Sequence, residues 1–181
     1  MSEISDKEIL LQYFEGDKNK AFTLLLQKYQ ERLYWHIRKI VVSHENADDV
    51  LQNTFIKVWK YLSNFKQQSS LYTWLYRIAT NEALAHLKKN KPEYHLPLSE
   101  NESEFANKLS DDNLYTGDEI ALKLQTAINT LPEKQKLVFN MKYFDEMKYK
   151  EISEILDTSV GALKASYHIA VKKIEEYLKD D

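Results

Sequence analysis

The scarcity of helix breakers constrains the fold of this chain more than any other feature of its sequence. Its 181 residues include only three glycines and three prolines. Because glycine and proline are the residues that most often end or interrupt helices, long segments can run without a break. The chain is therefore expected to be all-α. No glycine-rich phosphate loop occurs, which argues against nucleotide binding through such a loop.

The composition excludes several other classes of protein. Apolar residues make up 43% of the chain and charged residues 29%, as in a globular rather than a disordered protein. The absence of cysteine excludes disulfides, thiolate metal sites and cysteine nucleophiles, and it fits a reducing compartment. No apolar run reaches membrane-spanning length, and the N-terminal MSEISDKEIL lacks the basic and apolar regions of a secretion signal. We therefore expect a cytoplasmic protein.

Apolar residues at helical spacing predict four helices in the N-terminal part of the chain. Residues 5–8, SDKE, have the form of a capping box that begins the first helix, and Gly16 ends it. The second helix is expected from Asp17 to about Val42, and the third from about 45 to 62. The fourth has a predicted inner stripe of Leu71, Trp74, Leu75, Ile78, Glu82 and Ala85.

Helical periodicity stops near Asn90. Residues 92–117 contain two prolines and are rich in Ser, Asn, Asp and Glu, which predicts a flexible acidic linker. This linker would join two small helical domains, residues 1–91 and 118–181. In the second domain a capping box is expected at residues 130–133, TLPE.

The last two predicted helices have the form of a helix-turn-helix. The turn is Asp157-Thr158-Ser159, in which Thr158 or Ser159 is expected to cap the last helix. The predicted buried seam comprises Ile152, Ile155, Leu156, Val160, Leu163, Tyr167, Val171 and Ile174. The outward face would carry Gly161, Lys164, Ala165, His168 and Lys172, which suits the phosphates and base edges of DNA. An ordinary helical hairpin with a solvated face is the alternative.

Residues 70–89, SLYTWLYRIATNEALAHLKK, combine aromatic rings with cations. Unpaired nucleic acid is a partner that needs both, because its bases stack on rings while its phosphates bind cations. The preceding polar loop, residues 64–70, has donors and acceptors for the edge of an extruded base. Alternatively the rings are core packing with polar tips at the surface. Trp74 lies on the inner stripe and is expected in the core, whereas Tyr72 and Tyr76 are expected outside it.

No catalytic arrangement is recognisable. His44 and Asp48 are four residues apart and could share a metal ion, but no second pair has matching spacing, so surface capping is favoured. No serine, histidine and acid arrangement stands out. We therefore expect no enzymatic activity, no metal, no cofactor and no small-molecule substrate.

Two groups of motifs resemble bacterial sigma factors of the sigma-70 family. Residues 46–59, NADDVLQNTFIKVW, resemble region 2, in which an acidic pair precedes V-x-Q-x-T-F, and residues 65–66 and 69–81 are similar to the rest of that region. Residues 131–139 and 159–164 resemble region 4. The short middle section is similar to the extracytoplasmic-function (ECF) class, which keeps only these two domains.

The resemblance implies a factor that binds core RNA polymerase and directs it to promoter DNA. Residues 1–91 would bind polymerase and melt the minus-ten element, and residues 118–181 would bind the minus-thirty-five element. The implied polymerase contacts are Asp48, Asp49, Gln52, Asn53 and Phe55. The implied minus-ten contacts are Phe65, Lys66, Ser69, Ser70, Tyr72, Trp74, Tyr76, Arg77, Asn81, Lys88 and Lys89. The implied minus-thirty-five contacts are Thr158, Ser159, Gly161, Lys164, Ala165, His168 and Lys172.

The chain departs from the family in its last helix, which carries Ser166, Ile169 and Val171 where arginines are frequent. Fewer phosphate contacts are therefore expected there. The net charge of −3 also predicts weak DNA binding by the free protein, because duplex affinity grows with the number of phosphates neutralised.

Other readings of the sequence remain open at this point. A stand-alone helix-turn-helix regulator would explain residues 118–178 but leave the aromatic helix and the acidic pair without a role. A helical interaction module without DNA activity is a third alternative. An anti-sigma factor, often membrane-linked, is a common partner in the family and is a candidate partner here.

Overall fold

The computed structural model describes residues 4–90 and 119–179, and every regular element within those ranges is a helix. The all-α prediction is confirmed. The chain divides into two compact units, unit 1 (Met1–Lys89) and unit 2 (Asn90–Asp181). The predicted acidic linker of residues 92–117 lies outside the described residues, so its boundaries stay a prediction.

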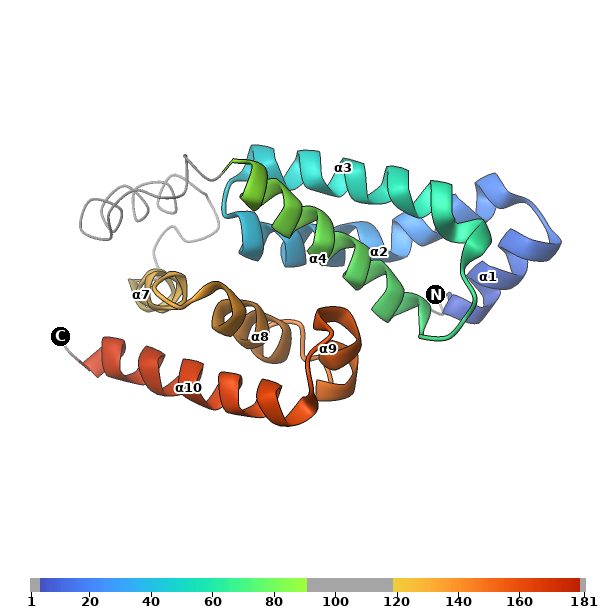
Figure 1. The fold of residues 1–181 in the computed structure, drawn as a ribbon. Helices are drawn as coiled ribbons and strands as arrows, with labels where there is room; N and C mark the ends of the chain where they lie inside the picture. The colour runs from blue at the N-terminus through green and yellow to red at the C-terminus, as the bar shows by residue number, and fades with distance from the viewer. Residues whose placement is uncertain (1–3, 91–118, 180–181) are drawn as a thin grey trace. The chain divides into compact units, whose positions relative to one another are not determined.

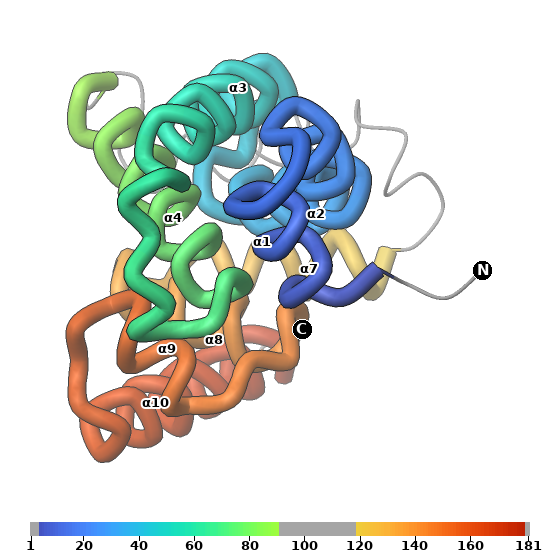
Figure 2. The backbone as a smooth tube through the Cα atoms, turned by 90° about the vertical axis from the view of Figure 1, so that its right-hand side faces the viewer, coloured from blue at the N-terminus to red at the C-terminus, as the bar shows by residue number. Residues whose placement is uncertain are grey.

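Unit 1 is a helical bundle built around one long central helix. It comprises α1 (Asp6–Glu15), α2 (Lys18–Val41), α3 (His44–Tyr61), the short 3-10 helix η1 (Leu62–Asn64) and α4 (Leu71–Lys89). Helix α2 packs against α1, α3 and α4, and α3 also packs against α4 (Figure 1). The view in Figure 2 shows α1 lying across α2. Every helix of the bundle therefore buries one face against a neighbour.

The start of unit 1 follows the predicted capping chemistry. The Ser5 hydroxyl accepts from the Glu8 amide at 3.2 Å, and the Glu8 carboxylate accepts from the Ser5 amide at 2.7 Å. The capping box is thus confirmed, and Gly16 ends α1 as expected. Behind it, Asp6 accepts hydrogen bonds from the Lys28 ammonium at 2.8 Å and the Tyr29 hydroxyl at 2.6 Å, which fix α1 on α2.

Unit 2 is built on its last helix. Helix α10 (Val160–Lys179) packs against α7 (Glu119–Asn129), α8 (Glu133–Tyr143) and α9 (Tyr149–Leu156) (Figure 1). One cluster of its core comprises Ala127, Ile128, Leu131, Phe139, Ala170 and Ile174.

The capping box predicted at residues 130–133 is wrong. Helix α8 begins at Glu133 with Pro132 at its cap, and no side chain caps it. The Thr130 hydroxyl instead donates to the carbonyl of Ala127 at 2.7 Å, so it closes the end of α7. The motif fits either role because threonine hydroxyls bond to nearby backbone groups in both places.

Candidate nucleic-acid and polymerase interface

The polar residues of the acidic motif form one exposed strip on α3. Its N-terminus is capped by Ser43, whose hydroxyl accepts from the Asn46 amide. The apolar side of α3 faces the core, so the opposite side carries Asp48, Asp49, Gln52 and Asn53, all exposed. Asp48 lies 3.5 Å from the Nε2 atom of His44, and the two form an exposed pair one turn apart; the cap itself is Ser43 rather than either of them. The strip presents carboxylate and amide groups to a partner.

An apolar groove lies beside this strip, between α2 and α3. Its volume is about 470 Å³. Its lining comprises Phe22, Leu26, Gln30, Asp48, Leu51, Gln52, Phe55, Ile56 and Trp59. The rings of Phe22 and Trp59 meet edge to face with centroids 4.9 Å apart. The groove thus combines apolar walls with a rim that is acidic on one side.

Two exposed groove residues were missed from the sequence. Ile56 is 59% exposed and Trp59 is 45% exposed, and they lie together in one groove, as apolar side chains at interaction sites do. Helical spacing places Ala47, Leu51, Thr54, Phe55, Val58 and Leu62 on one face of this helix. Ile56 and Trp59 lie off that face, and their displacement was the signal that could have identified them. Phe55, by contrast, is only 8% exposed, so it forms the floor of the groove rather than a projecting contact.

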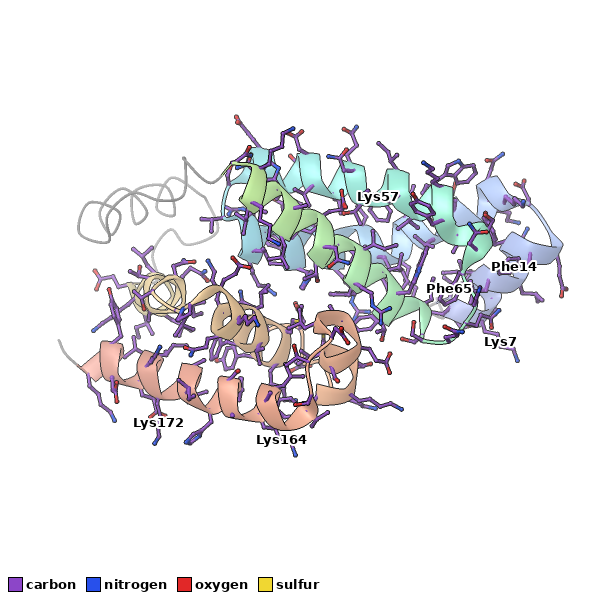
Figure 3. All side chains as sticks on the ribbon, in the orientation of Figure 1. Lys7, Phe14, Lys57, Phe65, Lys164 and Lys172 are labelled. Carbon is purple, nitrogen blue, oxygen red and sulfur yellow. The ribbon has the colours of Figure 1, made fainter. Side chains whose placement is uncertain are left out.

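The loop before α4 brings polar groups to the start of that helix. The Ser70 hydroxyl accepts from the Thr73 amide at 3.0 Å and so caps α4. Phe65, labelled in Figure 3, is buried, and its ring centroid lies 5.1 Å from that of Trp74. Lys66 is exposed and Ser69 is half-buried. Ser70 therefore lies at a helix N-terminus, where amide groups and the helix dipole favour anions, and the exposed Lys66 precedes it in the same loop.

The buried side of α4 differs from the predicted stripe. Tyr76 is only 2% exposed, so the expectation of a surface ring is wrong. Its ring crosses to α2 and meets the His36 ring at a centroid distance of 4.8 Å. Conversely Ala85, expected inside, is exposed. A tyrosine ring gains so much from burial that spacing alone cannot assign it to the outside.

The other predicted residues of α4 fall into two groups. Tyr72, Trp74 and Arg77 are half-buried. Asn81, Lys88 and Lys89 are exposed. The placement expected for Trp74 is therefore only half right, because its indole packs on Phe65 yet keeps an exposed part. The accessible surface of α4 is richer in cations and amides than in rings.

The helix-turn-helix of unit 2 is held by a left-handed residue and a serine cap. Asp157 adopts φ 50° and ψ 50° at the end of α9, a conformation that aspartate tolerates better than most residues. The Ser159 hydroxyl accepts from the Ala162 amide at 3.3 Å, so Ser159 is the cap. The Thr158 hydroxyl donates back to the Leu156 carbonyl at 3.1 Å instead. The turn therefore uses one of the two predicted capping residues.

The outer face of α10 is open. Lys164 and Lys172 project from its outer edge (Figure 3), and the five residues predicted on this face are all exposed. A Cβ added at Gly161 would meet no atom within 4 Å. The buried seam comprises Ile152, Ile155, Leu163, Ala170 and Ile174. Val160, predicted in the seam, is 36% exposed because it is the first residue of the helix.

The ammonium groups of two lysines lie over the ring of Tyr149 in the helix-turn-helix. Its ring centroid lies 5.2 Å from the Lys142 ammonium and 5.8 Å from the Lys164 ammonium. Burial raises the pKa of the Tyr149 hydroxyl, so it stays neutral at physiological pH. The sequence analysis did not identify this cluster, because it joins α8, α9 and α10 through contacts that helical spacing does not reveal.

Two other kinds of site were sought within residues 4–90 and 119–179. No group of three or more His, Asp or Glu side chains there could hold a metal ion. None of the described helices is both long and apolar enough to cross a membrane.

Comparison with protein families assigns a region to each unit. Residues 25–93 match the family model for sigma-70 region 2, and residues 121–174 match a model for sigma-70 region 4. The chain is 30% identical to the RNA polymerase sigma-H factor of Pseudomonas aeruginosa, covering 99% of this chain and 96% of that protein. It is 29% identical to the ECF RNA polymerase sigma factor SigW of Bacillus subtilis, covering 98% and 99%.

Solved structures share the fold at low sequence identity. CnrH, solved in complex with the cytosolic domain of CnrY, matches with a TM-score of 0.71 at 20% identity, over 97% of this chain and 98% of that chain. The sigma factor RpoE from Bartonella quintana, solved with the anti-sigma factor NepR, matches with a TM-score of 0.69 at 20% identity, over 90% and 99%. These likenesses show the fold of both units.

Proposed function

Because the chain belongs to the sigma-70 family of RNA polymerase sigma factors, in its ECF group, we propose how each unit contributes to transcription initiation. The protein is a sigma factor that binds core RNA polymerase and recognises and melts promoter DNA. A stand-alone regulator is not supported, since the relatives match unit 1 as well as unit 2. The observation that carries the residue-level proposal is the presence of two exposed faces of different chemistry: an acidic strip beside an apolar groove, and a cationic helix face.

The α3 strip and its groove are the proposed polymerase contact. Asp48, Asp49, Gln52 and Asn53 would hydrogen-bond or pair with basic groups, while Ile56 and Trp59 supply the apolar area that carries most binding energy. Phe55 supports the groove from below. The partner surface is expected to be a helix that offers both apolar and basic side chains.

The loop of residues 65–70 and the accessible side of α4 are the proposed minus-ten contact. Lys66, Arg77, Lys88 and Lys89 supply charge for phosphates. Asn81, Ser69 and Ser70 supply donors and acceptors for base edges. The buried rings of Phe65 and Tyr76 would hold this surface in shape, and Trp74 and Tyr72 are the rings that keep an accessible part.

The outer face of α10 is the proposed minus-thirty-five contact. Gly161 and Ala165 allow close approach to a groove, and Lys164, His168 and Lys172 carry the donors. Ser159 caps α10, the helix proposed to enter the DNA groove, and Thr158 precedes it in the turn. Tyr149 would hold the Lys164 ammonium near the start of the helix.

The sigma-factor function also indicates where the protein works and that it acts by binding rather than by catalysis. A protein that acts on polymerase and chromosomal DNA works in the cytoplasm, where both reside. Its role requires binding and ordering of DNA strands, so we propose that it has no catalytic activity of its own and no small-molecule substrate.

An anti-sigma factor is a further proposed partner. Two of the solved structures that share this fold, CnrH and RpoE, are named as complexes, one with the cytosolic domain of CnrY and the other with the anti-sigma factor NepR. A protein that covered the α3 groove would block polymerase binding until it was released. Competition between a candidate anti-sigma factor and core polymerase for this chain would test that proposal.

Run-off transcription tests the whole assignment. The full-length chain is mixed with core polymerase and genomic DNA fragments, and the transcripts are mapped. Discrete start sites that appear only when the chain is added are expected, together with co-elution of chain and polymerase in gel filtration. Transcripts no different from those of core polymerase alone would contradict the proposal.

A further inference from the structure

A row of stacked side chains joins α2 to α4 in unit 1. The Arg32 guanidinium carbon lies 5.3 Å from the Tyr72 ring centroid. The Tyr72 ring lies 4.4 Å from the Tyr76 ring, which in turn lies 4.8 Å from the His36 ring. At the inner end of the row, the His36 Nε2 atom and the Thr80 hydroxyl oxygen are hydrogen-bonded at 2.8 Å. The row runs from the buried interior to the surface, where it ends at Arg32.

Arg32 is fixed in place while its donors stay unused. It is exposed, and within the described parts of the chain its guanidinium makes no hydrogen bond or ion pair. A guanidinium that stacks on a ring keeps its N–H groups directed outward in its own plane. It also stays charged at any physiological pH. Such a group is preorganised to donate hydrogen bonds to two oxygens of an anion such as a phosphate.

The position of Arg32 associates it with the DNA-binding end of α4. Tyr72 is the second residue of α4 and follows Ser70, which caps that helix, by two positions. The Tyr72 ring already contacts Arg32 and Tyr76, so less of it is available to a base than the sequence suggested. The exposed cation at the end of the row is therefore better placed to contact DNA than the rings behind it.

We infer that Arg32 binds a phosphate of the DNA strand that unit 1 opens, and that Tyr72 positions it. This inference rests on the proposed function and adds a residue of α2 that no motif indicated. Tyr76, His36 and Thr80 anchor Tyr72 from inside the bundle.

The test is the salt dependence of binding to an opened promoter. Holoenzyme is assembled with wild-type chain or with Arg32→Ala, and its affinity for a fluorescein-labelled promoter with a pre-melted minus-ten region is measured by anisotropy at several KCl concentrations. The promoter is the one that run-off transcription identifies. Arg32→Ala is expected to bind about tenfold more weakly. Its log–log salt slope is expected to be smaller in magnitude by about 0.7, the value for one phosphate on a single strand.

Three variants separate this role from others. Lys20→Ala removes an exposed cation from the same helix and is expected to leave the slope unchanged. Arg32→Lys keeps the charge and should restore the slope while recovering only part of the affinity. Tyr72→Leu removes the ring that positions Arg32 and should weaken binding, but by less than Arg32→Ala does. If Arg32→Ala lowers the unfolding midpoint of the chain, Arg32→Gln gives the same slope comparison.

The outcomes distinguish this inference from the proposed function. A wild-type slope in Arg32→Ala, or a loss of polymerase binding without a change of slope, would overturn the role of Arg32 alone. If wild-type holoenzyme failed to bind the template at all, the proposed function would fail, and this inference with it.

Discussion

The two helices proposed to bind DNA expose their surfaces in different ways. In unit 2, α10 turns Leu163, Ala170 and Ile174 inward and leaves Gly161, Ala165 and lysines outside. In unit 1, α4 turns Tyr76 into the core and leaves Tyr72 wedged between Tyr76 and Arg32. The lysines of α10 thus mark its outer face, whereas a tyrosine fits either side of a helix because it has an apolar ring and a polar tip.

The largest expected effect tests the burial of Tyr76. Tyr76→Ala should reduce the stability of unit 1 by about 3–5 kcal/mol, because it removes a buried ring and leaves a cavity. All three tryptophans, Trp35, Trp59 and Trp74, lie in unit 1, so tryptophan fluorescence during urea unfolding reports on that unit alone. A midpoint equal to that of the wild type would mean that the ring is not packed as described.

Leu163→Ala is the matched control in the other unit. Leu163 is fully buried at the start of α10, so its truncation should cost about 2–5 kcal/mol. The loss should appear in far-ultraviolet circular dichroism and leave the tryptophan transition unchanged. A shift of both signals would show that the two units unfold together.

The next effect concerns the apolar groove of unit 1. Ile56→Glu places a charge in the apolar groove at a position that is 59% exposed, so the fold should tolerate it. Core polymerase binding is expected to fall by about 30-fold, equivalent to the loss of about 2 kcal/mol from a binding hot spot. Leu11→Glu, at an exposed position of α1 outside the groove, is the control. Equal polymerase affinity of the two variants, measured by surface plasmon resonance, would rule out the groove as the contact.

The sequence predicts helices and faces better than it predicts contacts between them. Helix positions and the open face of α10 follow from apolar spacing, since each of these depends on residues close in the chain. The Thr130 motif and the placement of Tyr76 could not be settled that way, because neighbouring helices decide them. Arg32 over Tyr72 and Lys164 over Tyr149 join residues far apart in sequence, so no local pattern indicates either pair.

A smaller effect distinguishes unit 2 by its pH dependence. Burial lowers the pKa of Lys136 from 10.5 to about 8, and its ammonium group hydrogen-bonds to Asn129. Between these two pH values the unfolded chain holds a proton that the folded chain has released, so the stability of unit 2 should rise with pH across that window. Lys136→Met should lose this rise when unfolding is followed by circular dichroism. If the stability of the variant rose with pH as steeply as that of the wild type, this role of Lys136 would be contradicted.

The smallest effect concerns the cap of α10. Ser159→Ala removes the hydroxyl that accepts from the Ala162 amide and should cost unit 2 about 1 kcal/mol. Ser159→Asp should retain most of the stability because aspartate also caps helices. Thr158→Ala is expected to cost less, since its hydroxyl bonds back to α9. The three variants are compared by thermal unfolding. A larger loss of stability in Thr158→Ala than in Ser159→Ala would assign the cap to Thr158.

The division of labour between the units is tested most directly by transcription from two templates. One is the full promoter duplex, and the other lacks the minus-thirty-five DNA and carries a pre-melted minus-ten region. Holoenzyme with Lys164→Ala and Lys172→Ala should lose activity on the first template and keep wild-type activity on the second. Holoenzyme with Lys66→Ala should lose activity on both. If the α10 variant lost activity equally on the two templates, separate roles for the two units would be contradicted.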